Sequence, residues 1–304
     1  MNDWLPDRGA TAVPACAYPN RRSFVATCAG VALGWGCEPR HAWAANPDRI
    51  ESVSTHMGTQ FKIVLYSSDH AFARQVTDRA FARIAALDQT LSDYDPQSEA
   101  MRLSEQAGRF VRVSDDLWNA LRLSLAWWKA SEGAFDVTVN PVVRLWRRAR
   151  RDRKLPAPEI LAKAKALVGS EAIHLDASDR SVLLERPGTK LDFGGIAKGL
   201  AADAALEILR AHGLSRALVI AAGDIIAGDP PPGRDDGWAV DVESPGTPAG
   251  DPALSLRLKR SATSTSGDTA QFVEIEGRRY SHIVDPRTGL GVERRGSVTV
   301  VTSK

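Results

Sequence analysis

The chain has 304 residues, of which 43% are hydrophobic and 25% are charged, and its formal net charge is +2. This length and composition are sufficient for a sizeable hydrophobic core, in one large domain or two small ones. The balanced charge excludes a strongly basic surface, so we expect no nucleic-acid partner.

Residues 1–45 have the features of an export signal. The pair Arg21-Arg22 precedes an apolar run at residues 24–35, which is too short to span a bilayer as a stable helix. Residues 42–44 then have the small residues of a cleavage site. The arginine pair resembles a twin-arginine signal, and an ordinary Sec signal is the alternative. We therefore expect a periplasmic protein, cleaved near Ala44, that meets the membrane only through this signal or a partner.

All three cysteines, Cys16, Cys28 and Cys37, precede the expected cleavage site. The mature protein, residues 46–304, would therefore contain no thiol and no disulfide. This excludes a cysteine nucleophile, a zinc-thiolate site and an iron–sulfur cluster. The chemistry of the mature chain must use oxygen and nitrogen groups.

The first half of the mature chain reads as a strand followed by helices. Residues 61–66 are a strand-like apolar run, and residues 71–91 have a helical stripe. That stripe consists of Phe72, Val76, Ala80, Ile84 and Leu87. Ser114 is a good N-cap for the next helix, because acidic residues and a helical apolar series follow it.

A loop at residues 131–141 is expected to contain a short extended piece and to lead into a helix opened by Pro141. The basic run at residues 147–153 is most simply a solvated end of that helix. A short helix at residues 160–167 follows. Further along, Leu200, Ala204 and Ile208 indicate a helix that Gly213 ends. Strand-like runs lie at residues 172–175, 182–185, 217–221, 238–242, 254–258, 272–275 and 297–301. Alternation in the later runs favours antiparallel pairing.

The stretch at residues 191–199, Leu-Asp-Phe-Gly-Gly-Ile-Ala-Lys-Gly, opens the helix that contains Leu200. Glycines let backbone approach a ligand, and the first turn of a helix presents N–H groups that suit phosphate. Lys198 adds a cation, and Asp192 is an acceptor for a hydroxyl or amide. The alternative is a tight turn with a solvated lysine, because the spacing matches neither the P-loop nor the dinucleotide fingerprint.

Two further stretches contain polar side chains suited to chemistry. Residues 263–268 form a hydroxyl-rich turn, and residues 280–289 read as a strand that leads into a turn. Arg287 suits a pyrophosphate, and His282 and Asp285 suit acid, base or metal-ligand roles. The alternatives are a polar hairpin for the first stretch, and for the second a turn capped by Asp285 beside an ordinary half-buried histidine.

An ordered set of six motifs resembles the FAD:protein FMN transferases, the ApbE-type flavin transferases. The motifs are Met57-Gly58-Thr59, Ser92-Asp93-Tyr94, Gly133-Ala134-Phe135-Asp136, Asp192 to Gly199, Thr265-Ser266-Gly267-Asp268 and His282 to Gly289. The resemblance covers residues 52–302. It implies an α+β fold with mixed or antiparallel sheet, packed helices, and FAD in a cleft between two subdomains.

The resemblance also implies a reaction and a set of site residues. FAD is cleaved with Mg²⁺ present, FMN passes to a threonine hydroxyl of a partner protein, and AMP leaves. The implied FAD contacts are Met57, Tyr94, Ala134, Phe135, Asp136, Asp192, Lys198 and Val284. Lys198 can also assist the pyrophosphate split, and His282 has either a catalytic or a structural role. The backbone carbonyl of Gly195 is the implied metal ligand, and the implied partner is an exported or membrane-anchored electron-transfer flavoprotein.

The resemblance implies two more metal ligands, an Asp and a Thr, in a motif that would follow the last predicted strand. This sequence ends at Lys304, where that motif would begin. A transferase domain without this C-terminal part is expected to bind Mg²⁺ weakly. The alternative function is therefore a non-catalytic FAD-binding or flavin-carrier protein of the periplasm.

Overall fold

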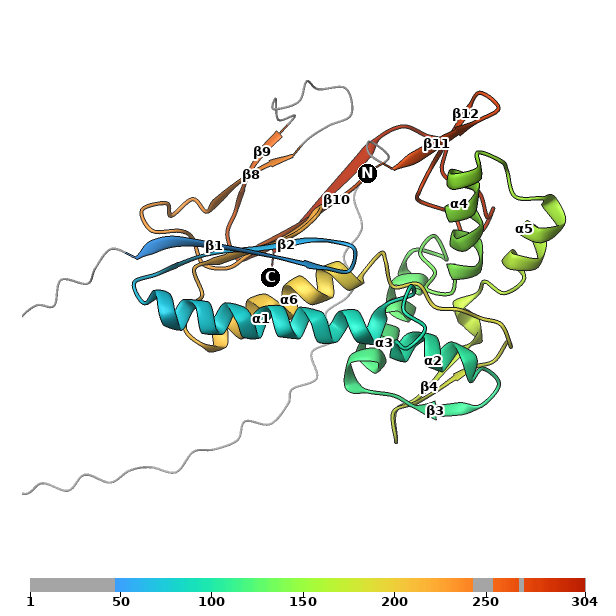
Figure 1. Cartoon of the computed structure of the whole chain (residues 1–304), viewed down its shortest axis with the longest axis horizontal. Coiled ribbons are helices and arrows are strands. Elements are labelled where there is room, and N and C mark those ends of the chain that lie inside the picture. Colours follow the sequence, from blue (N-terminus) through green and yellow to red (C-terminus); the bar gives the residue numbers. More distant parts are fainter. Residues whose placement is uncertain (1–46, 243–253, 268–270, 304) are drawn as a thin grey trace, which may run out of the picture. The chain divides into compact units, whose positions relative to one another are not determined.

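The computed structural model describes residues 47–242, 254–267 and 271–303, and the expected export signal with its cysteines lies outside these ranges. The described chain has the α+β fold that the sequence predicts, with helices packed against antiparallel sheets (Figure 1). No helix in the described ranges is both long and apolar enough to cross a membrane.

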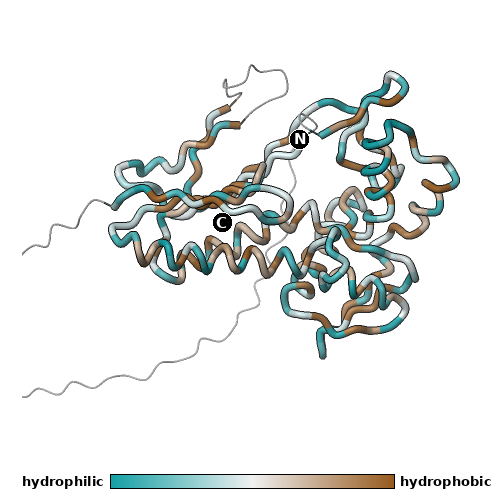
Figure 2. The backbone as a smooth tube through the Cα atoms, viewed as in Figure 1, coloured by the Kyte–Doolittle hydropathy of each residue, from teal (hydrophilic) through white to brown (hydrophobic). Residues whose placement is uncertain are grey.

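The largest sheet has six strands in the order β1-β2-β6-β7-β10-β13, and every neighbouring pair is antiparallel. The strands span Asp48–His56, Thr59–Ser67, Ala217–Ala221, Asp224–Ala227, Ser261–Gly267 and Ser297–Ser303. Figure 2 shows hydrophobic residues along the central strands of this sheet. Both faces of its centre are covered, so the sheet supplies most of the core.

Strand β2 is buried on both faces, which explains why apolar residues occupy consecutive positions along it. Phe61, Ile63 and Leu65 pack in one cluster with helices α1 and α6, which span His70–Leu91 and Ala197–Ala211. Val64 points to the opposite face. There it packs with the hairpin of β8 and β9, which span Trp238–Val242 and Leu254–Leu258. Because both faces are buried, neither set of alternating positions has to be polar.

The predicted helix faces are correct for most positions. In α1, Asp69 caps the N-terminus by accepting from the N–H of Phe72 at 2.9 Å, and four residues of the predicted stripe are buried. Phe72 itself is 38% exposed, because the buried stripe begins at Ala73 in that turn. In α6 the fully buried face likewise lies one position beyond the predicted one, at Ala201 and Ala205. The predicted face of α6 packs half-buried beside it.

A second group of elements extends the same core. Helices α2 and α3 span Glu99–Glu105 and Asp115–Ala130, and Ser114 caps α3 as predicted by accepting from the N–H of Leu117 at 3.2 Å. A three-stranded antiparallel sheet has the order β3-β5-β4. In this order its strands span Phe110–Arg112, Ser181–Leu184 and Ile173–Asp176. A 3-10 turn at Ser170–Ala172 precedes β4.

A separate apolar cluster joins helices α4 and α5 to a hairpin late in the chain. The elements are α4 at Asn140–Asp152, α5 at Pro158–Lys165, β11 at Phe272–Ile275 and β12 at Arg278–Ser281. Trp146 of α4 is 2% exposed, lies against Tyr280 with ring centroids 5.0 Å apart, and donates from Nε1 to the carbonyl of Gly289 at 2.8 Å. This bond fixes the turn at residues 285–289 against α4.

Two local predictions are wrong, and three strands were not predicted. Residues 263–267 lie in strand β10 and not in a polar turn, because β7 and β13 on either side supply backbone partners for the Ser/Thr-rich segment. Residues 137–139 form turns and no strand, since the backbone there bonds locally and to Asp192. Strands β1, β3 and β7 have too little apolar alternation for their sequences to indicate them, and β12 spans Arg278–Ser281 where a strand was expected to begin at residue 280.

Candidate functional site

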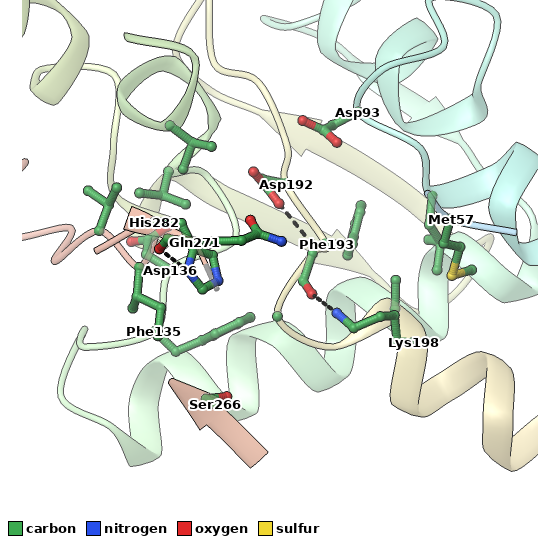
Figure 3. Close-up of a pocket in the computed structure, with 18 of the residues that line it drawn as sticks. Met57, Asp93, Phe135, Asp136, Asp192, Phe193, Lys198, Ser266, Gln271 and His282 are labelled. Carbon is green, nitrogen blue, oxygen red and sulfur yellow. Dashed lines mark hydrogen bonds between the residues drawn. The ribbon is translucent and has the colours of Figure 1, made fainter. Parts of the chain in front are cut away.

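A cavity of about 560 Å³ lies beside the end of α1, the face of α4 and the start of α6. The ten residues that the family resemblance assigns to the site all line this one cavity. These residues are Met57, Tyr94, Ala134, Phe135, Asp136, Asp192, Gly195, Lys198, His282 and Val284. They come from five separate stretches of the chain, so only the folded structure brings them together (Figure 3).

Met57 lies in the tight turn between β1 and β2. Its φ is +50°, a left-handed conformation that is uncommon for a residue with a side chain. Its backbone N–H donates to the carboxylate of Asp88 on α1 at 2.7 Å. The Asp88 carboxylate therefore holds the turn, and with it the Met57 side chain, at the wall of the cavity (Figure 3).

The glycine-rich loop before α6 is held by its own hydrogen bonds. The Gly194 N–H donates to Oδ1 of Asp192 at 2.8 Å, and Lys198 Nζ donates to the Gly194 carbonyl at 2.9 Å. The N–H groups of Ile196 and Ala197 both donate to the carbonyl of Phe193. The expected open row of N–H groups is therefore largely satisfied within the loop. Lys198 remains the cation that this loop presents at the cavity.

Gly195 is exposed on the cavity and lies against Phe135. A Cβ at this position would be 3.1 Å from Cε2 of Phe135, which is closer than most side-chain contacts. The absence of a side chain therefore lets the ring of Phe135 lie beside the loop backbone. This close approach explains why the second of the paired glycines, Gly195, has no side chain.

Asp136 is 6% exposed, and its carboxylate is occupied by hydrogen bonds within the protein. Oδ1 accepts from Thr138 N, Thr138 Oγ1 and Ser170 Oγ at 2.8, 2.6 and 2.7 Å, and Oδ2 accepts from Ser170 N at 3.0 Å. The carboxylate thus joins the 134–139 loop to the 3-10 turn. Its immediate effect is to fix the backbone that presents Ala134 and Phe135 to the cavity.

A charged cluster forms one wall of the cavity. Arg147 Nη1 lies 2.5 Å from Oδ2 of Asp93, and Nη2 lies 3.5 Å from Oδ2 of Asp192. The Arg147 guanidinium also lies over the ring of Tyr94, with Cζ 4.1 Å from the ring centroid. Asn140 Nδ2 donates to Oδ2 of Asp93 at 3.0 Å. Figure 3 shows Asp93 and Asp192 on the same side of the cavity.

Burial and the charge of Asp93 raise the pKa of Asp192, although the Gly194 N–H, Arg147 and Lys198 oppose this shift. Burial by itself would lower the pKa of Arg147. The hydrogen bond to Asp93 and the surrounding negative charges nevertheless raise the pKa of Arg147 above its ordinary value. The guanidinium therefore stays charged at all relevant pH values, and Asp192 is the group in this cluster whose protonation the surroundings favour.

The position of Arg147 corrects the prediction that residues 147–153 are only a solvated helix end. Arg148 and Arg151 are exposed, but Arg147 and Arg150 line the cavity. The helical spacing of residues 139, 143, 147 and 150 places them on one face of α4, and all four line the cavity. This spacing was the signal available in the sequence, and the run of arginines obscured it.

His282 and Gln271 also line the cavity (Figure 3). The His282 backbone N–H donates to the carbonyl of Gln271 at 3.0 Å, and Nδ1 lies 3.1 Å from the same oxygen. Asp285 and Arg287 pair with each other at 3.1 Å and do not line the cavity. Arg287 lowers the pKa of Asp285 by this hydrogen bond. The expected pyrophosphate contact of Arg287 is therefore not part of this geometry.

Within the described ranges, no group of three or more His, Cys, Asp or Glu side chains is arranged to hold a metal ion. The cavity instead combines the aromatic side chains of Phe135, Tyr94 and His282 with the cations Lys198, Arg147 and Arg150. Aromatic rings of a ligand can pack against these aromatic side chains, and phosphate oxygens of a ligand can pair with these cations. The fold and the cavity thus define an α+β protein whose cavity is suited to a ligand with both aromatic rings and phosphates.

Comparison with known proteins gives the family. A model of the ApbE family matches residues 57–304, and the chain belongs to this family. An FAD:protein FMN transferase of Klebsiella pneumoniae is 30% identical over 81% of this chain and 75% of its own length. One of Haemophilus influenzae is 32% identical over 69% of this chain and 63% of its own length. The crystal structure of the ApbE protein of Thermotoga maritima superposes with a TM-score of 0.76 at 27% identity, over 84% of this chain and 82% of its own.

Proposed function

We propose that this protein transfers FMN from FAD to a threonine hydroxyl of a partner protein in a Mg²⁺-dependent reaction that releases AMP. The observation that carries the proposal is the single cavity lined by all ten predicted site residues in a chain of the ApbE family. The names of the related transferases support the transfer of FMN from FAD to a protein.

In the proposed reaction, the acceptor oxygen forms a bond to the FMN phosphorus, and the anhydride bond to AMP breaks. The rings of FAD pack against Met57, Tyr94 and Phe135, with Ala134 and Val284 completing the apolar contact. Lys198 pairs with the pyrophosphate, whose negative charge increases on the leaving AMP. Asp192 accepts a hydrogen bond from the ligand. The carboxylate of Asp136 supports the loop that these contacts need.

His282 is the proposed proton acceptor for the threonine hydroxyl. The contact of Nδ1 with the Gln271 carbonyl fits the tautomer with its proton on Nδ1. Nε2 then has the lone pair that can take the hydroxyl proton as the O–P bond forms.

Mg²⁺ would shield the negative charge of the pyrophosphate oxygens. This cation is commonly bound by one or two protein oxygens together with substrate phosphates and water. The backbone of Gly195, exposed at the cavity in the loop that precedes Lys198, suits such a site through its carbonyl. We propose the Gly195 carbonyl as the protein ligand of Mg²⁺.

We also propose that the protein is exported through its N-terminal signal and acts on an electron-transfer flavoprotein outside the cytoplasm. The basis is the arginine pair before a short apolar run. The expected result is recovery of the processed chain in a periplasmic fraction, with retention of the precursor inside the cell when Arg21 and Arg22 are both changed to Lys. Equal export of the wild type and this variant would contradict the twin-arginine route.

The reaction is tested by incubating the chain with FAD, Mg²⁺ and a flavin-acceptor domain, followed by intact mass measurement of the acceptor. We expect an increase of one FMN that EDTA abolishes. Lys198→Ala should slow transfer by about 10 to 100-fold, because this factor corresponds to the free energy of one hydrogen bond to a charged group. Lys163→Ala, an exposed lysine on α5, is the matched control. Bound FAD without any mass increase would instead favour a flavin-binding protein that does not catalyse transfer.

A further inference from the structure

Arg147 is a charged side chain at the cavity to which the preceding scheme assigns no role. We propose that Arg147 is a positioning residue of the flavin site, which holds Asp192 and Tyr94 in place for FAD by balancing the charges of Asp93 and Asp192. This inference rests on the proposed function, because it assumes that the cavity takes FAD.

The first observation is that Arg147 bridges three separate segments. The residue belongs to α4, Asp93 lies in the loop after α1, and Asp192 lies in the loop before α6. One guanidinium reaches both carboxylates, at 2.5 and 3.5 Å. The planar fork of arginine is suited to pairing with two carboxylates at once, whereas a lysine offers a single point charge.

The second observation is that the two carboxylates are buried together. The side chains of Asp93 and Asp192 are 9% and 11% exposed, and the charge of Asp93 acts on Asp192. Two neighbouring carboxylates in a poorly solvated site cannot both stay ionised unless a cation offsets them. Arg147 lies between them. Lys198 also acts on Asp192, but its Nζ donates to the Gly194 carbonyl.

The third observation concerns Tyr94. Its side chain is 76% exposed, and the guanidinium of Arg147 lies over one face of the ring. Such a cation–π contact favours one orientation of an otherwise mobile ring. The remaining surface of the ring stays available to an aromatic ligand in the cavity. One residue thus fixes both an acceptor and an aromatic surface of the proposed flavin site.

The fourth observation is that α4 cannot rotate to release Arg147. Val142, Trp146 and Ala149 on the other face of the helix are buried in their own apolar cluster. The packing of this face keeps residue 147 directed at the cavity. The next residue, Arg148, is exposed on the same helix and therefore provides a matched control.

The test measures the dissociation constant of FAD for the whole chain with Mg²⁺ present, by the change in flavin fluorescence. Arg147→Gln is expected to weaken binding at least tenfold, which corresponds to about 1.4 kcal/mol. Arg148→Gln should stay within about twofold of the wild type. Arg147→Lys keeps the charge and should lose less affinity than Arg147→Gln, which separates the charge from the shape of the side chain.

A double variant distinguishes charge balance from a structural role. Asp93→Asn combined with Arg147→Gln removes one carboxylate together with the cation, so it should recover most of the affinity that Arg147→Gln loses. Wild-type affinity in Arg147→Gln, or no recovery in the double variant, would overturn the inference while the proposed function stands. Failure of the wild-type chain to bind FAD would overturn both.

Discussion

The Asp136 carboxylate gives the sharpest prediction on stability. Asp136→Ala removes the acceptor for four hydrogen bonds, from the N–H and the hydroxyl of both Thr138 and Ser170. Thr138 and Ser170 are 0% and 1% exposed, so water cannot replace the lost acceptor without local opening. The Thr138 hydroxyl also accepts from the Gly169 N–H at 2.7 Å, which extends the same network to a third residue.

The size of the effect follows from these donors. An unsatisfied buried donor costs about 1–3 kcal/mol, but the two hydroxyls can rotate toward other acceptors. The two backbone N–H groups cannot, so we expect Asp136→Ala to lower the free energy of unfolding by about 3–5 kcal/mol. This is a large part of the stability of a typical domain, which is about 5–15 kcal/mol. Asp136→Asn retains one acceptor oxygen and should cost less.

Urea unfolding monitored by circular dichroism measures this loss, with Asp152→Ala on the exposed end of α4 as the control. A loss below about 1 kcal/mol in Asp136→Ala would refute the structural role that its hydrogen bonds indicate. If FAD affinity fell in that variant while stability did not change, the carboxylate would instead act by contacting the ligand directly.

Two further predictions concern an ion pair and a buried indole. Arg83 donates to both oxygens of Asp116 at 2.5 Å and lowers the pKa of that carboxyl. The ion pair therefore stabilises the folded protein at pH values above the ordinary carboxyl pKa. This stabilisation is lost as the pH falls through the lowered pKa of Asp116. Arg83→Gln should therefore cost about 0.5–1 kcal/mol near neutral pH and less in acid, as measured by urea unfolding; equal losses at both pH values would contradict this reasoning. Trp146→Phe leaves the Gly289 carbonyl without its indole donor and should lower the midpoint of urea unfolding by the equivalent of about 1–2 kcal/mol, whereas an unchanged midpoint would show that water replaces the donor.

The sequence predicted several apolar strands well because burial leaves a local pattern. Four expected runs, at residues 217–221, 238–242, 254–258 and 272–275, match β6, β8, β9 and β11 in their bounds. Strand β10 was missed, since its serines and threonines have the composition of a turn. Its extended conformation depends on β7 and β13, which come from distant parts of the chain.

The chemical motifs were also predictable, but their environments were not. Residues such as Lys198 and His282 belong to short stretches whose order indicates the family, and all the predicted site residues line one cavity. The sequence did not indicate that the Asp136 carboxylate is fully engaged inside the protein. It also did not separate Arg147, which lines the cavity, from the exposed Arg148 beside it.

The sequence by itself determined the class of fold, most of the buried helix faces and ten of the residues that line the cavity. Helical and strand periodicity and motif order are local properties, so they can be read along the chain. Only the tertiary structure decided which polar groups are paired with one another. Partners such as Asp93, Arg147 and Asp192 are far apart in sequence, and the protonation and orientation of each depend on the charges and burial that folding brings around it.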